Sequence, residues 1–92
     1  MQGKRVWPTT EGYIPAGRMS EKGTFGRISE EICPGYERQH WWQVTAPDGS
    51  QCSLNPAIHT ITEHDDGTIT VNPSIVTATW HGWLRLGNWE SA

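Results

Sequence analysis

Residues that favour turns recur at short intervals along this 92-residue chain, and their spacing limits what the chain can fold into. In the second half they form four groups, Pro47-Asp48-Gly49, Asn55-Pro56, Asp65-Asp66-Gly67 and Asn72-Pro73. Proline lacks a backbone N–H and glycine tolerates a positive φ, so each group interrupts regular structure. Intervals of about 8 to 12 residues accommodate short strands but no helix of normal length. The pattern predicts an all-β fold.

Alternation of apolar and polar residues predicts about six short strands in a small antiparallel β-sandwich or open barrel. The first hairpin should pair residues 41–46 with 50–54 around the Pro-Asp-Gly turn. This pairing places Trp42, Val44 and Ala46 on one face.

A second hairpin should pair residues 58–63 with 68–72, with Gly67 forming a bulge after a type I turn. We expect Ile61 opposite Ile69 and His59 opposite Val71, whereas a one-residue slip would set Ile61 against Thr70. The chain should then turn a corner at 72–74 and continue as strands 75–80 and 82–89. In the last strand, Leu84 and Leu86 should lie opposite Trp83 and Arg85.

Residues 1–23 are dense in Gly and Pro, which predicts an irregular N-terminal arm before a single small β domain at 24–92. Trp7, Tyr13 and Ile14 are too apolar for a free tail, so the arm should lie on the domain or on a neighbouring subunit. Met19 is a candidate start of a shorter natural form that keeps the domain intact.

Composition excludes several classes of function. Hydrophobic residues make up only 35% of the chain but include six Trp, so we expect aromatic side chains to form the core. The net charge is −3 and Lys4-Arg5 is the only adjacent basic pair, which argues against sequence-independent binding to nucleic acid. The chain lacks an apolar run of about 20 residues and residues 1–17 lack a signal-peptide centre. We therefore expect a soluble intracellular protein with no membrane partner.

Metal binding would need converging side chains, and the weak candidates are Cys33, Cys52, His59 and His81. Their spacing matches no zinc motif, so we expect no metal or cofactor, and a zinc site would have to be assembled from separate strands. The absence of a secretion signal favours two reduced thiols. The alternative is a Cys33–Cys52 disulfide. The chain also lacks a nucleophile elbow and a phosphate-binding glycine pattern, so no catalytic residue is predicted.

The most informative segment is Trp80-His81-Gly82-Trp83. On a strand, His81 and Trp83 share one face, and Arg85 lies beside them. Flat rings next to an Arg could bind a base, a small ring ligand or a partner protein, with Trp41 on the same surface. Trp41, His81, Trp83 and Arg85 are therefore the candidate ligand-binding residues. The alternative, favoured by the shortage of other large apolar residues, is that Trp83 belongs to the core.

Residues 40–90 resemble a family of uncharacterised small phage proteins, some of which are labelled ammonia-monooxygenase-like. The resemblance rests on the segments His40-Trp41-Trp42, Pro47-Asp48-Gly49, Asp66 through Ile75 (DGTITVNPSI) and Trp80-His81-Gly82-Trp83-Leu84. Relatives look richer in cysteine, which would suit zinc, whereas Trp80 precedes His81 here. The resemblance implies a phage or prophage origin and production in a bacterial cytoplasm.

Together these observations predict a non-catalytic phage accessory protein with an anti-defence role in the host cytoplasm. It would sequester a small host molecule, such as a signalling nucleotide, or block a host factor, and it would act as a homo-oligomer. The alternative is a minor virion or capsid-decorating protein whose arm at residues 1–18 grips a neighbouring subunit. A third hypothesis is a zinc-stabilised module or zinc enzyme.

Overall fold

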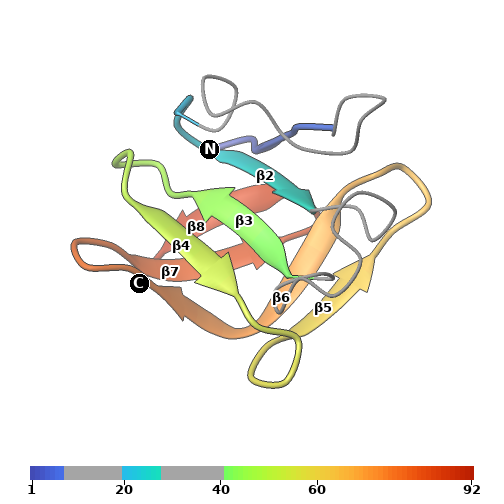
Figure 1. Cartoon of the computed structure of the whole chain (residues 1–92). Coiled ribbons are helices and arrows are strands. Elements are labelled where there is room, and N and C mark those ends of the chain that lie inside the picture. Colours follow the sequence, from blue (N-terminus) through green and yellow to red (C-terminus); the bar gives the residue numbers. More distant parts are fainter. Residues whose placement is uncertain (8–19, 28–40) are drawn as a thin grey trace.

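The computed structural model describes residues 1–7, 20–27 and 41–92, and these form an all-β fold (Figure 1). The described residues contain two four-stranded sheets, each open rather than closed into a barrel. The first consists of β1 (Lys4–Arg5), β2 (Thr24–Arg27), β3 (Trp42–Thr45) and β4 (Gln51–Leu54), and the second of β5 (Thr60–Glu63), β6 (Ile69–Val76), β7 (His81–Arg85) and β8 (Asn88–Ser91). Neighbouring strands are antiparallel except β1 and β2. The predicted fold class is confirmed, with eight strands instead of about six.

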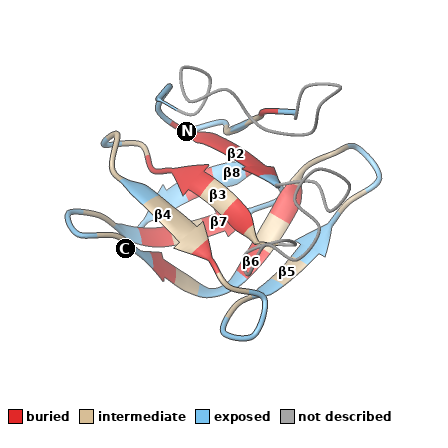
Figure 2. Cartoon of the chain, in the orientation of Figure 1, coloured by how far each residue is buried: buried red, intermediate tan, exposed pale blue. Residues whose placement is uncertain are grey.

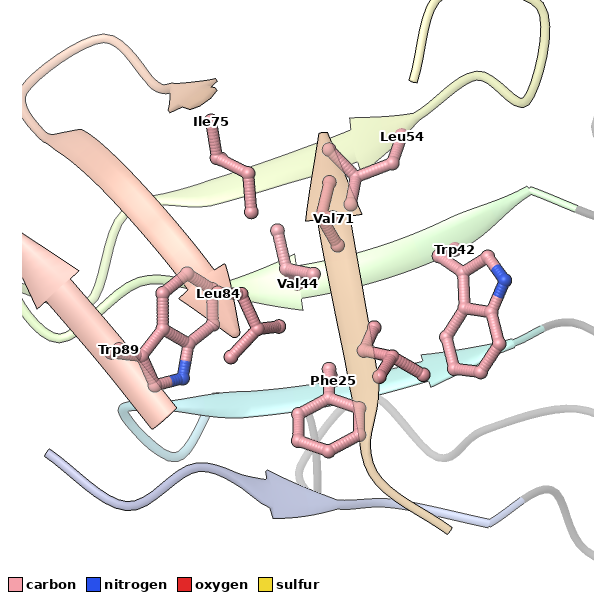
Figure 3. Close-up of a cluster of buried hydrophobic side chains, with 9 residues drawn as sticks. Phe25, Trp42, Val44, Leu54, Val71, Ile75, Leu84 and Trp89 are labelled. Atoms are coloured by element: carbon pink, nitrogen blue, oxygen red, sulfur yellow. The ribbon is translucent and has the colours of Figure 1, made fainter. Parts of the chain in front are cut away.

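The core lies between the two sheets (Figure 3). Its buried members are mainly aliphatic: Val44, Leu54, Ile69, Val71, Ile75 and Leu84, joined by Phe25, Trp42 and Trp89. Buried residues gather in β2, β3, β6 and β7, whereas β5 is largely exposed (Figure 2). The expectation of an aromatic core was only partly right, because Trp7 is 55% exposed and Trp41 and Trp83 are half-buried.

The first hairpin forms as predicted. β3 pairs with β4 from Trp42 opposite Leu54 to Thr45 opposite Gln51. Gly49 has a φ of 92° and donates its backbone N–H to the carbonyl of Ala46 at 2.8 Å. This backbone conformation explains why the turn needs glycine.

The second hairpin forms, but both registers considered from the sequence were wrong. Ile61 lies opposite Val71, and Glu63 lies opposite Ile69. The ladder continues to His64 and Thr68, so only residues 65–67 form the loop, with Gly67 at a φ of 88°. This is the three-residue loop with a glycine bulge, and the expected register had placed the centre of the turn one residue too early in the sequence. A shift of two residues preserves the face, so Ile61 still lies on the same side as Val71.

The predicted corner at 72–74 is wrong, because β6 runs through it as one strand. Residues 72–74 form an irregularity in the pairing of β6 with β7. Val71 pairs with Leu84 before it, and Ile75 pairs with Gly82 after it. The Asn72–Pro73 peptide bond is cis. A bulge lets a strand continue where a proline cannot donate to the ladder.

The predicted strands 75–80 and 82–89 also have different bounds. β6 ends at Val76, and a turn closes where Thr77 donates its N–H to the carbonyl of Trp80. The segment after Gly82 is a hairpin, in which β7 and β8 meet at the two-residue turn Leu86-Gly87. Leu86 is therefore 61% exposed and does not share the buried face of Leu84, because a turn ends the alternation.

Residues 1–7 lie on the domain, which was one of the two alternatives for the N-terminal arm. β1 pairs with β2, and Val6 is buried. Gly3 donates its N–H to the carbonyl of Gly87 at 2.7 Å, and Trp89 donates its N–H to the carbonyl of Met1 at 2.8 Å. The N-terminus therefore connects the edges of both sheets. Tyr13, Ile14 and Met19 lie outside the described residues.

Candidate functional site

The outer face of β7 carries three of the four residues predicted to bind a ligand. Gly82 and Leu84 are buried, so His81, Trp83 and Arg85 point away from the core. The rings of His81 and Trp83 have centroids 6.0 Å apart, and the guanidinium carbon of Arg85 lies 5.3 Å from the Trp83 ring centroid. Trp83 is outside the buried core cluster, so its assignment to the core was wrong.

Exposed apolar residues lie at both ends of this row. Val76 pairs directly with His81 across the ladder and is 62% exposed. Leu86 follows Arg85 at the tip of the hairpin and has a φ of 48°, which is unfavourable for a leucine. We call the five residues Val76, His81, Trp83, Arg85 and Leu86 the β7 surface.

Gly82 explains why the two Trp residues of the Trp-His-Gly-Trp segment have different surroundings. Trp80 packs against the core and meets Trp89 edge to face, with ring centroids 5.4 Å apart. A Cβ on Gly82 would lie 2.5 Å from Cη2 of Trp80 and against the carbonyl oxygen of Glu90. Glycine therefore lets the Trp80 ring lie across β7, while Trp83 stays on the outer face.

Trp41 belongs to a different part of the molecule from the other three predicted residues. It is half-buried and immediately precedes β3, in the first sheet, whereas His81, Trp83 and Arg85 belong to the second sheet. The row on β7 is thus formed by one strand, and Trp41 lies just before β3 of the first sheet.

Ser74 accepts or donates hydrogen bonds with two of the predicted histidines. Nε2 of His81 is 3.0 Å from Oγ of Ser74, and Nε2 of His59 is 3.4 Å from the carbonyl oxygen of Ser74. A serine beside a histidine is also the start of a nucleophilic dyad, but such a dyad requires a third group that orients the imidazole. Among the described contacts the His81 ring meets Ser74 and Trp83, so we interpret the Ser74 contact as one that orients the imidazole.

The weak metal candidates are not brought together by the residues that the structure describes. Cys52, His59 and His81 belong to no group of three or more His, Cys, Asp or Glu side chains, and Cys33 lies outside the described residues. Cys52 is a free thiol, and its burial raises the pKa of the thiol, which disfavours the thiolate that binds metals. Cys52 instead lies 3.9 Å from the carbonyl of Val76.

A polar cluster that the sequence analysis missed joins the turns of the two sheets. Asp48 accepts hydrogen bonds from Ser50 in its own turn and from the hydroxyl of Thr79 at 2.6 Å. The hydroxyls of Ser50 and Thr77 are 2.6 Å apart. The hydrogen bonds from Ser50 and then Thr79 lower the pKa of Asp48 below its usual value of 3.8. Asp66 likewise accepts hydrogen bonds within its own turn, where those from Thr68 lower the pKa of its carboxyl group.

Arg5 was also missed, although its basic pair with Lys4 was noted. Nη1 of Arg5 is 2.7 Å from Oε2 of Glu63 and 3.1 Å from the carbonyl oxygen of Gly67. The guanidinium lies 3.8 Å from the ring centroid of Trp7 and 5.0 Å from that of Trp42. No sequence spacing connects residues this far apart, so no local signal could have revealed the cluster.

Two hollows in the described surface are lined by residues that do not belong to the β7 surface. The first is lined by Lys4, Arg5, Val6, Trp7 and Glu21 and has a volume of about 240 Å³. Its cations already have carboxylate partners, since Lys4 pairs with Glu21 at 3.6 Å and Arg5 pairs with Glu63. The second, next to Trp42, is described below.

Comparisons with protein-family models, with curated proteins and with solved structures found no match to this chain. The phage origin implied by the resemblance therefore stays a prediction. In the described part of the chain, no helix has the length and apolar character needed to span a bilayer.

Proposed function

We propose that this chain is a non-catalytic binding protein that attaches to a partner protein through the β7 surface. The observation that supports this most is the arrangement around Trp83, where an imidazole and a guanidinium flank an indole on an outward face. Trp and Arg are the residues that most often dominate the free energy of protein association. His81 and Arg85 both contact the Trp83 ring, so these side chains lose less conformational freedom on binding than isolated ones would.

The exposed ends of the row favour a protein partner over a small molecule. Val76 and Leu86 add apolar area on either side, and Leu86 adopts a backbone conformation in which Asn or Gly would be preferred. Local rules are often broken at functional sites. Small ligands bind in concave sites, and none of the five residues of the β7 surface lines either of the two hollows noted above.

The charge of the β7 surface also indicates what kind of partner it suits. Arg85 pairs with Glu90 at 3.4 Å in an exposed ion pair, so the β7 surface is close to neutral. Such a surface suits a partner with a mixed apolar and polar patch, and it does not suit a polyanion. If the chain comes from a phage, as the resemblance predicts, the partner would be a host factor that the protein blocks.

The virion alternative relied on the N-terminal arm. Residues 1–7 are used within their own domain, in β1 and in the contacts of Met1 and Gly3 with β8 and its turn. The case for an arm that grips a neighbouring subunit therefore rests on residues 8–18, which lie outside the described residues. Detection of the protein in purified particles would revive this alternative.

Affinity capture with matched variants tests the proposal. The wild-type protein, Trp83→Ala and Trp7→Ala would each be used to capture proteins from the bacterial host, and the captured proteins would be identified by mass spectrometry. Trp7 is a suitable control because it is also exposed but stacks on Arg5 of β1 and is not a residue of the β7 surface. We expect one host protein to be lost with Trp83→Ala and kept with Trp7→Ala. Equal capture by all three would contradict the proposal.

Self-association is a separate outcome that the same variants detect. We predict a homo-oligomer from the size of the chain, and light scattering after size exclusion measures its mass directly. If the wild-type protein is oligomeric and Trp83→Ala makes it monomeric, the β7 surface binds a second copy and not a host protein.

A further inference from the structure

The second hollow lies where the two sheets meet at one edge. It has a volume of about 370 Å³ and is lined by Arg27, Trp42, Pro56, His59, Thr60 and Ile61. Arg27 ends β2 and lies directly opposite Trp42 of β3, while Thr60 and Ile61 belong to the edge strand β5. Its volume is in the range of about 300 to 1,000 Å³ that is typical of small-ligand sites.

The side chains around this hollow are mainly hydrogen-bond donors. Arg27 is exposed, and no carboxylate among the described residues pairs with it, unlike Arg5 and Arg85. Trp42 is buried, but its indole nitrogen points away from the core cluster (Figure 3). Guanidinium and indole N–H groups only donate, and the hydroxyl of Thr60 can donate as well.

His59 adds a polar atom that the fold leaves unused. Its Nε2 lies 3.4 Å from the carbonyl oxygen of Ser74, and its Nδ1 is buried without a hydrogen-bond partner. Because Nε2 faces a carbonyl oxygen, it carries the proton of a neutral ring, and Nδ1 is an unused acceptor that a hydroxyl or other donor group of a ligand would satisfy. The described residues that line the hollow include no acidic side chain.

We propose that this hollow binds a small organic anion. Its phosphate or carboxylate oxygens would accept hydrogen bonds from Arg27 and from the indole of Trp42, and its apolar part would lie against Pro56 and Ile61. Charge-assisted hydrogen bonds to a guanidinium are the strongest contacts that such a group can make. The described lining of this hollow shares no residue with the β7 surface, so the anion proposal does not depend on the proposed protein partner.

Heteronuclear NMR of the ¹⁵N-labelled full chain tests this site. The probes are inorganic phosphate and benzoate, each compared with sodium chloride at equal ionic strength. The reporter is the indole N–H signal of Trp42, assigned by its loss in Trp42→Phe. We expect a saturable shift of this signal with at least one probe, and a dissociation constant at least about tenfold higher in Arg27→Gln.

Matched variants make the result decisive. Lys22→Gln removes an exposed cation beside Gly49, outside both proposed sites, and should leave the affinity unchanged, while Arg27→Lys should retain part of it. Arg27 is exposed, so its replacement should leave the fold and the remaining spectrum intact. A response to phosphate alone would identify phosphoryl groups as the ligand chemistry, and a response to benzoate would identify an apolar carboxylate. A shift that sodium chloride reproduces, or that Arg27→Gln leaves unchanged, would overturn the proposal.

Discussion

The two adjacent basic residues, Lys4 and Arg5, should contribute very differently to stability. The Lys4–Glu21 pair joins two exposed side chains, with 69% and 62% of their areas accessible. The Arg5 side chain is 12% exposed and joins β1 to the β5–β6 hairpin of the opposite sheet. Exposed pairs contribute about 0.2–1 kcal/mol, because water screens them and side-chain entropy opposes them.

The cost of removing Arg5 follows from its contacts. Its hydrogen bonds with Glu63 and Gly67 are charge-assisted, a class worth about 1.5–3 kcal/mol each, and two indole rings lie within cation–π distance. Two terms reduce the net value. Glu63 is 44% exposed and can be hydrated after the change, and the buried Nε of Arg5 has no partner. We therefore expect Arg5→Ala to lower the free energy of unfolding by about 2–3 kcal/mol and Lys4→Ala by less than about 0.5 kcal/mol.

Urea denaturation followed by far-UV circular dichroism measures both values. Two double-mutant cycles, Arg5→Ala with Glu63→Ala and Lys4→Ala with Glu21→Ala, separate the pair energies from general effects. The coupling energy should be about 1–2 kcal/mol in the first cycle and near zero in the second. Equal losses for Arg5→Ala and Lys4→Ala, or equal couplings, would refute the idea that Arg5 ties the two sheets together.

Three further predictions concern the turns and β7. Leu86→Asn should raise the free energy of unfolding by about 0.5–1 kcal/mol in urea denaturation, because Asn tolerates the positive φ, yet it should weaken partner capture. Gly82→Ala should lower the melting temperature by many degrees, because the new Cβ collides with the Trp80 ring and the β8 backbone. Asp48 has a lowered pKa, so its stabilising effect is present above its usual value of 3.8 and is lost as the pH falls through the lowered value. Urea titrations at several pH values should show a smaller acid-induced loss of stability in Asp48→Asn.

Each of these predictions has an outcome that counts against it. A Leu86→Asn protein that is less stable than the wild type would mean that the exposed leucine packs in a way the fold does not show. Wild-type stability for Gly82→Ala would show that the Trp80 ring can move aside at no cost. An unchanged pH profile in Asp48→Asn would mean that its hydrogen bonds form equally well with the protonated carboxyl group.

Much of the local structure could be predicted because the deciding contacts lie close together in the sequence. Glycine at positions 49 and 67 marks a turn wherever it occurs, since a positive φ is a property of the backbone. The inward face of β3 also followed from alternation alone, with Trp42 and Val44 buried. The same alternation supplied the shared face of His81 and Trp83 on β7, whereas their outward position came from the structure, since the sequence had favoured a core position for Trp83.

Strand bounds were harder to predict, because pairing partners set them. The corner expected at Asn72-Pro73 became a bulge within β6, since β7 pairs with this strand on both sides of the irregularity. The Leu86-Gly87 turn was missed for a related reason. Leucine is a poor marker of a positive φ, and only the pairing of Arg85 with Asn88 requires one there.

The sequence by itself determined that this protein is all-β, where its first two hairpins turn and which residues of β7 share a face, because these depend on the conformations of single residues and on a two-residue period. Only the tertiary structure decided which side chains meet across the sheets. The contact of Arg5 with Glu63 and the hollow that joins Arg27 to His59 bring together residues from different sheets. Such contacts depend on how two twisted sheets pack, and no local pattern in the sequence encodes that geometry.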